Sequence, residues 1–220
     1  MQQITATRSE SQILATNKVL RNTYALLSMT LLFSAATAGI AMMMNLPAFN
    51  PIITLVGYFG LLFATAKFRN SGLGILFVFM LTGFMGLTLG PILNFYLATA
   101  NGSQMVMTAL GGTGVIFLAM SGYALTSRKD FSFMGGFLMI GILVAFLGGI
   151  AAMIFSMPLM SLVVSGMFVL LMSGLILFET SNIIQGGETN YIMATVSMYI
   201  SIYNMFVSLL HLMTAFGGNE

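Results

Sequence analysis

Apolar residues run along most of the chain in long stretches, and short polar breaks separate these stretches. A helix needs about 20 predominantly apolar residues to cross the hydrocarbon of a bilayer. Seven stretches come close to or exceed that length, with approximate bounds at 23–44, 48–66, 73–97, 105–126, 133–155, 159–184 and 191–215. The breaks are rich in Gly, Pro, Asn and Ser, which favour turns over continued helix. The pattern therefore predicts an all-α, polytopic membrane protein built as a bundle of seven transmembrane helices.

The composition strengthens this prediction. The 220 residues are 58% hydrophobic and 5% charged, and the mean hydropathy is +1.00. Soluble domains carry about 25% charged residues, so this chain has too few polar side chains to cover itself in water. The first apolar stretch is also longer than the core of a signal peptide, which has about 7–15 apolar residues. Membrane lipid is thus the expected surrounding, and the first stretch is expected to remain as an anchor.

The lysines and arginines all fall before the first predicted helix or in the breaks that follow the second and fourth helices. They are Arg8, Lys18, Arg21, Lys67, Arg69, Arg128 and Lys129. The intervening breaks contain none, and the positive-inside rule makes the basic side cytoplasmic. Seven crossings then place the amino terminus inside and the carboxyl terminus outside. If the last two helices formed a re-entrant pair, the carboxyl terminus would return to the cytoplasm.

The chain leaves room for no soluble domain. We expect a flexible cytoplasmic tail over residues 1–22, a membrane domain over 23–215 and a short carboxyl-terminal tail over 216–220. The first of these segments is polar, and such composition disfavours stable structure in isolation. Because about the first ten residues precede every predicted helix, their removal should leave the fold intact.

Small residues in the third predicted helix indicate close packing between helices. Gly86 and Gly90 form a G-x-x-x-G pair, and Gly83 extends the same face. In lipid, small residues let two backbones approach each other, and here we expect packing within one chain rather than between two copies. Pro91 predicts a kink just after Gly90, with Asn94 one turn further along, able to face a polar interior.

The last predicted helix carries a stripe of polar side chains. Its members are Ser197, Ser201, Asn204, Ser208 and His211, at spacings of 4, 3, 4 and 3 residues. These spacings place all five on one helical face, which should point into the bundle or into a hydrated cavity rather than toward lipid. His211 falls near the outer end of the helix, where a structural role is expected and pH sensing is the alternative.

Glu179 is the only acidic residue inside a predicted helix core. The turn near 186–190 makes the last two helices antiparallel neighbours, so Glu179 and Ser197 should lie at similar depth. An intramembrane carboxyl group is a candidate functional site, and a hydrogen-bonded glutamate that serves only packing is the alternative. The candidate proton or ion site comprises Glu179, Ser197, Ser201 and Asn204, with Asn182 as a supporting polar residue.

The remaining side chains argue against an enzyme, a metalloprotein or a nucleic-acid binder. There are no cysteines, one histidine and five acidic residues, so we predict neither a metal site nor a cofactor. Ser121, Ser165 and Ser173 each precede a glycine, but none lies in a G-x-S-x-G motif. Asp130 is the only aspartate, which excludes a pair of catalytic aspartates. No cluster of basic and aromatic residues suggests nucleic acid.

Four stretches of the chain carry a resemblance to a known family. They are "TNKVLRNTYALLSMTL", "LGPILNFYL", "FETSNIIQGGETNYI" and "SMYISIYNMFVSLL". Together they closely resemble the bacterial YccA-like branch of the Bax inhibitor family, in the same order along the whole chain. The resemblance implies a seven-helix protein of the bacterial inner membrane that binds and modulates the membrane-anchored AAA protease FtsH. It also implies FtsH's associated membrane complex as a further partner, and leaves open that the protein is itself a slow substrate.

The same resemblance implies an alternative function, a pH-sensitive leak for a cation such as calcium or the proton. Family members with leak activity carry acidic residues on both of the last two helices. Glu179 in "LFETSNII" matches the first of these, whereas Ser201 stands where the second would fall. Two facing carboxyl groups titrate jointly, and one carboxyl group beside a serine cannot. Protease modulation is therefore the main prediction, with the leak as the alternative.

Overall fold

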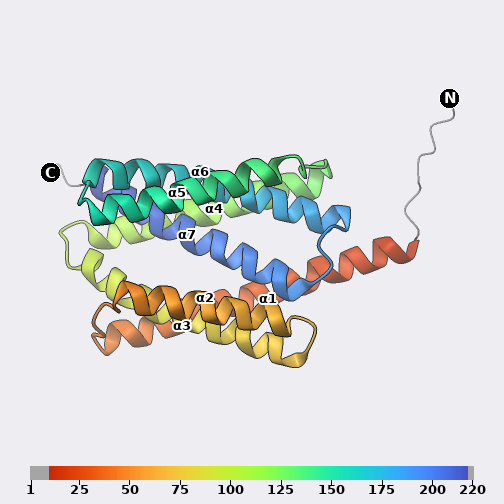
Figure 1. The fold of residues 1–220 in the computed structure, drawn as a ribbon, viewed down its shortest axis with the longest axis horizontal. Helices are drawn as coiled ribbons and strands as arrows, with labels where there is room; N and C mark the ends of the chain where they lie inside the picture. Colours follow the sequence, from red (N-terminus) through yellow and green to blue (C-terminus); the bar gives the residue numbers. More distant parts are fainter. Residues whose placement is uncertain (1–9, 218–220) are drawn as a thin grey trace.

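The computed structural model describes residues 10–217, and these residues form seven α-helices with no strand among them (Figure 1). The helices are α1 (Glu10–Met43), α2 (Pro51–Phe68), α3 (Gly72–Leu97), α4 (Gly102–Ser127), α5 (Met134–Ile154), α6 (Pro158–Gln185) and α7 (Tyr191–Gly217). Each contains a segment that is long and apolar enough to cross a membrane. The predicted seven-helix membrane bundle is confirmed.

The first helix begins earlier than the apolar pattern indicated. Helix α1 starts at Glu10 rather than near residue 23, so the second part of the predicted flexible tail is helical. The segment "ESQILATNKVLR" contains mostly good helix formers, and it extends a helix that is already nucleated in the membrane. The prediction of a flexible tail, which rested on polar composition, therefore does not hold for residues 10–22. The rest of that tail, residues 1–9, and the last residues, 218–220, lie outside the described part of the chain.

The helices form two groups of three with α7 between them. Helix α3 contacts both α1 and α2 in one group, and α6 contacts both α4 and α5 in the other. Helix α7 packs against α1, α4 and α6, and in Figure 1 it crosses between the two groups. Several of its side chains are completely enclosed, among them Met198, Tyr199, Met205 and Leu210. Helices α2 and α5 lie on the flanks of the bundle and do not contact each other.

The turn between α6 and α7 is held by its own backbone and by side chains that cap the start of α7. Gly186 ends α6 in the left-handed conformation, with φ at 79°, which glycine adopts without steric cost. The Gly187 N–H donates to the Asn182 carbonyl at 2.9 Å. The Asn190 Oδ1 accepts from the Met193 N–H at 3.0 Å and so caps the start of α7. Asn182 thus supports the turn that sets the register of the last two helices.

Glycines let α1 and α3 pack closely along much of their length. A Cβ at Gly86 would overlap the Thr37 Oγ1 and the Ser34 carbonyl oxygen, and one at Gly90 would lie 2.5 Å from the Cβ of Ala41. The close packing of α3 predicted from these glycines is therefore packing within one chain. Helix α3 continues as one helix through Pro91. One turn later, the Asn94 Nδ2 donates to the Met42 carbonyl of α1 at 3.2 Å.

The basic residues that the structure describes lie toward one end of the bundle. Lys18 and Arg21 lie near the start of α1, Lys67 lies in the last turn of α2, and the α2–α3 and α4–α5 connections carry Arg69, Arg128 and Lys129. These segments and the α6–α7 turn share one end of the molecule, and α7 finishes at the opposite end (Figure 1). Arg8 lies outside the described residues. Helices α6 and α7 each extend from one end of the bundle to the other (Figure 1).

We expect Gly86→Val to lower the free energy of unfolding by about 1–3 kcal/mol or more, because the new side chain meets the backbone of α1 and forces the helices apart. Gly111→Val is the matched control, since a Cβ there meets nothing within 4 Å. That change should stay within about 0.5 kcal/mol. Thermal unfolding in detergent micelles measures both, and equal losses would show that the α1–α3 contact is not as close as described.

Candidate functional site

Glu179 lies on α6, six residues before the helix ends at Gln185, which corresponds to about 9 Å at 1.5 Å per residue. Its side chain is only 8% exposed. The Ser197 hydroxyl of α7 donates a hydrogen bond to the Glu179 Oε1. The α6–α7 turn places these two residues opposite each other, since they stand at similar distances from it on the two antiparallel helices.

The second carboxyl oxygen of Glu179 has no such partner. The Oε2 atom is buried and accepts no hydrogen bond from the residues that the structure describes. No lysine or arginine of the described chain forms an ion pair with this group. A buried polar atom without a partner costs about 1–3 kcal/mol, so such atoms are rare and call for an explanation. A proton or a cation could bind here without displacing an existing salt bridge.

Hydroxyl groups from two further helices converge on the residue that follows Glu179. The Thr180 Oγ1 lies 3.3 Å from the Tyr24 hydroxyl of α1 and 3.5 Å from the Ser121 hydroxyl of α4. Thr180 is completely buried. These three hydroxyl groups form a polar cluster one residue along α6 from Glu179, and they supply no compensating charge.

The rest of the predicted site does not reach Glu179. The Ser201 hydroxyl donates to the Ser197 carbonyl within α7 at 2.9 Å. The Asn204 amide donates to the Ile200 carbonyl, also at 2.9 Å. The structure thus brings Glu179 and Ser197 together, and it leaves Ser201 and Asn204 further along the same helix without a hydrogen bond to the carboxyl group.

Two tyrosines of α7 make cross-helix contacts that the sequence analysis missed. The Tyr199 hydroxyl lies 2.6 Å from the Ser34 Oγ of α1, and it donates to the Thr82 carbonyl of α3 at 3.3 Å. The Tyr203 hydroxyl lies 3.3 Å from the Thr88 Oγ1 of α3. The signal was present as two tyrosines four residues apart in an apolar helix, which place two hydroxyl groups on one face.

His211 lies far from Glu179, near the other end of α7. Its Nδ1 is 2.8 Å from the Ser165 Oγ, which also donates to the Ser161 carbonyl at 3.0 Å. The Ser165–His211 pair thus links α6 to α7. In the described residues no group of three histidine, cysteine or acidic side chains could hold a metal ion.

Three of the four predicted cytoplasmic basic residues contact the end of α6 or the α6–α7 turn through their backbone carbonyls. The Lys129 carbonyl accepts from the Ser181 hydroxyl at 2.9 Å, and the Arg128 carbonyl accepts from the Gln185 amide at 2.9 Å. The Arg69 carbonyl accepts from the Asn190 amide at 3.0 Å. The side chains of all four basic residues are exposed. The Lys67 Nζ lies 5.9 Å from the centre of the Phe68 ring.

Comparison with known families settles the class of protein to which this bundle belongs. The profile of the family described as "Inhibitor of apoptosis-promoting Bax1" matches residues 16–218, which is nearly the whole chain. The chain belongs to the Bax inhibitor family. The match covers all seven helices apart from the first residues of α1, so the candidate site around Glu179 lies within the family's shared region.

Several relatives in this family are known from bacteria. The chain is 52% identical over 210 residues to the "Modulator of FtsH protease YccA" of Escherichia coli K12. This alignment covers 96% of this chain and 95% of the relative. The chain matches the "Inner membrane protein YccA" of Escherichia coli O6:H1 to the same extent. A membrane protein of Vibrio cholerae is 43% identical over 98% of this chain and 97% of its own length.

We expect Ser197→Ala to lower the free energy of unfolding of this Bax inhibitor family member by about 1–3 kcal/mol, because it removes the donor to a buried carboxyl group. Ser28→Ala is the control: Ser28 is exposed and bonds only to the Tyr24 carbonyl of its own helix, so its loss should stay within about 0.5 kcal/mol. Thermal unfolding in micelles compares the two. Equal effects would mean that the Ser197–Glu179 contact contributes nothing specific.

Proposed function

We propose that this protein binds and modulates the membrane-anchored AAA protease FtsH, and so acts in the quality control of membrane proteins rather than as an enzyme itself. The observation that carries the proposal is the 52% identity to the "Modulator of FtsH protease YccA", which extends over 95–96% of both chains. An alignment of that extent includes every helix that the structure describes.

The proposed location is the bacterial inner membrane, with the amino terminus in the cytoplasm. The chain is a multi-pass protein whose relative in Escherichia coli O6:H1 is named "Inner membrane protein YccA". The orientation rests on the basic residues described above, which gather toward one end of the bundle. The positive-inside rule assigns that end to the cytoplasm. The end of α7 then faces the periplasm.

The surface proposed for the protease is the start of α1. In Figure 1 this part of α1 extends beyond the rest of the bundle, at the end that carries the basic residues. It presents Ile13 and Leu14, which are 47% and 66% exposed. A helix end that projects past the bundle with exposed apolar side chains offers a surface on which a protein partner can pack. FtsH and its associated membrane complex could also contact the lipid-facing sides of the helices.

We expect the tagged protein to co-purify with FtsH from membranes in mild detergent, and an excess of it to slow the degradation of a membrane substrate of FtsH. Replacing Ile13 and Leu14 together by Ser should weaken co-purification at least several-fold, because it removes the exposed apolar contact. Replacing Leu118 by Ser on the lipid-facing side of α4 is the comparison, and an equal loss there would place the contact on the lipid-facing sides of the helices instead. Absence of both co-purification and slower degradation would refute the proposal.

The rate at which FtsH degrades this protein itself tests whether the protein is a slow substrate. A AAA protease must grip a free end before it can pull helices from the membrane, and residues 2–9 precede the first helix. Deleting them should preserve FtsH binding and remove slow degradation. A Gly-Ser segment of the same length in their place should restore degradation. Equal degradation rates for the full-length and shortened proteins would contradict a role for this end.

A second candidate function is a leak for a cation or the proton, and one observation favours it. The Glu179 Oε2 is buried without a hydrogen-bond partner among the described residues, beside the hydroxyl-rich region around Thr180. Ionisable groups inside the membrane commonly belong to ion or proton pathways. Family members with leak activity are expected to carry an acidic residue on each of the last two helices. This chain has Glu179 on α6 but Ser201 at the second position on α7, so a leak here would depend on one carboxyl group.

We expect any such leak to change with pH and to vanish in Glu179→Gln, because the amide keeps the shape of the side chain but cannot exchange a proton. Ion flux into liposomes that hold the purified protein measures this across a pH series. Glu188→Gln makes the same chemical change in the α6–α7 turn and serves as the control. Equal flux in Glu179→Gln and the parent protein would exclude this carboxyl group from conduction.

A further inference from the structure

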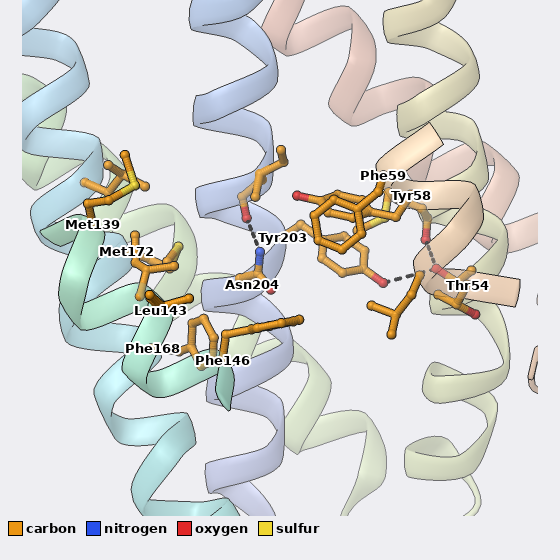
Figure 2. A pocket seen from close by; sticks show the side chains of 16 residues that line it. Thr54, Tyr58, Phe59, Met139, Leu143, Phe146, Phe168, Met172, Tyr203 and Asn204 are labelled. Atoms are coloured by element: carbon orange, nitrogen blue, oxygen red, sulfur yellow. Dashed lines mark hydrogen bonds between the residues drawn. The ribbon is translucent and has the colours of Figure 1, made fainter. Parts of the chain in front are cut away.

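The two helix groups leave a cavity between their flanks. Its volume is 530 Å³, within the range of about 300–1,000 Å³ typical of small-molecule sites. Helix α2 lines one side, α5 and α6 line the other, and α7 forms the floor together with part of α3. We call this space the α2–α5 groove. Figure 2 shows its side chains, and it is distinct from the Glu179 site because neither Glu179 nor Ser197 lines it.

The groove opens sideways, where the membrane surrounds the protein. Its rim carries Phe59 of α2 with Met139 and Leu143 of α5, which are 51%, 73% and 57% exposed. All three lie within helices that are long and apolar enough to span the bilayer. An occupant must therefore be soluble in the hydrocarbon of the membrane.

Aromatic side chains form much of the lining. Tyr58 and Phe59 come from α2, Phe146 from α5, Phe168 from α6 and Tyr203 from α7. Figure 2 shows that they project into the cavity from different helices. Aromatic rings pack best against other flat rings, in offset or edge-to-face arrangements. The lining suits a planar ring better than a flexible chain.

Two hydrogen-bond donors face the groove without a partner. The Asn204 amide gives one hydrogen to the Ile200 carbonyl, and its second hydrogen forms no hydrogen bond within the described residues. The Tyr58 hydroxyl likewise has no hydrogen bond there. Tyr203 differs, because the Thr88 hydroxyl donates to the Met85 carbonyl and so can accept from Tyr203. The groove thus offers an apolar lining, one donor from α2 on its side and one donor from α7 on its floor (Figure 2).

These donors discriminate between the possible occupants. A phospholipid acyl chain has no acceptor at this depth and would leave both donors unsatisfied in a medium without water. A partner transmembrane helix uses its backbone carbonyls internally, so it also offers few acceptors. A planar ring that bears carbonyl oxygens, attached to a long hydrocarbon tail, satisfies both the donors and the aromatic lining. That description fits the membrane quinones.

We propose that the α2–α5 groove is a binding site for a membrane quinone, whose ring lies among Tyr58, Phe146, Phe168 and Tyr203 while its tail extends into the lipid. The Tyr58 hydroxyl and the Asn204 amide donate to its carbonyl oxygens. The inference concerns binding only and involves no electron transfer. It does not rest on the protease partnership or on a leak through Glu179.

Tryptophan fluorescence tests the proposal directly, because the chain contains no tryptophan. Phe146→Trp places one fluorophore in the groove, and Leu118→Trp places one on the lipid-facing side of α4, where Leu118 is 69% exposed. Each protein is reconstituted in liposomes and titrated with decylubiquinone, whose ring quenches tryptophan. We expect saturable quenching for Phe146→Trp, and only shallow, linear quenching for Leu118→Trp. Linear quenching of equal slope at both positions would overturn the proposal.

The donors are tested in the Phe146→Trp protein. Tyr58→Phe and Asn204→Leu should each raise the half-saturating quinone concentration about tenfold, as the loss of one hydrogen bond predicts. Tyr123→Phe removes the hydroxyl of a half-exposed tyrosine on α4, outside the groove, and should leave the titration unchanged. Circular dichroism and gel filtration check that each variant folds. If Asn204→Leu does not fold, Tyr58→Phe alone tests the donors. Unchanged half-saturation in a folded Tyr58→Phe protein would show that its hydroxyl does not bind the ring.

A phospholipid acyl chain is the rival occupant, and phospholipids with brominated chains report on it because bromine quenches nearby tryptophan. We expect decylubiquinone to relieve bromine quenching of Phe146→Trp as it enters the groove. Bromine quenching that persists at every quinone concentration would assign the groove to a phospholipid chain instead.

Discussion

In the hydrocarbon of a membrane no water is available, so each polar group of a spanning helix must find its partner within the protein. This requirement accounts for the central position of α7. Its serines, tyrosines and asparagine would be costly if they faced lipid, and five of its residues reach hydroxyl, carboxyl or carbonyl groups of α1, α3 or α6. The two groups of three helices supply these partners from both sides. The position of α7 then fixes where the other helices can pack.

The few places where this requirement is not met are the most informative ones. One buried oxygen of Glu179 lacks a partner among the described residues, as do the buried hydroxyls of Thr23 and Ser127. The Tyr58 hydroxyl and the second amide hydrogen of Asn204, which line the α2–α5 groove, likewise form no hydrogen bond within the described chain. The carboxyl group lies toward the end of the bundle that carries the basic residues. The groove opens further along α7, where α2 and α5 stand apart. An ionisable oxygen suits a proton or a cation, whereas neutral donors in an aromatic lining suit an uncharged ring.

The contact between α1 and α3 depends on a different physical effect. Apolar side chains gain little by leaving lipid for the protein interior, so close helix packing depends on van der Waals contact at small residues. Gly86 and Gly90 allow the backbone of α1 to approach α3, and this contact holds the group that carries Ser34 and Tyr24. Both of those side chains then reach partners on the last two helices. The glycine contact thus helps to hold the hydroxyl groups around the candidate site.

The sequence by itself determined the number and approximate bounds of the helices, because a spanning helix has a minimum apolar length. It also determined that the face of α7 with Ser197 points inward, since a polar stripe cannot face lipid cheaply. It placed Glu179 level with Ser197 because the turn between their helices is short. It did not determine that α1 begins at Glu10, since the segment there is polar yet made of good helix formers. Only the tertiary structure decided that α7 lies between two groups of helices, that Ser201 and Asn204 do not reach Glu179, and that α2 and α5 leave a groove. The physical reason is that apolar side chains line both the lipid-facing and the interior sides of these helices, so hydropathy cannot tell one side from the other.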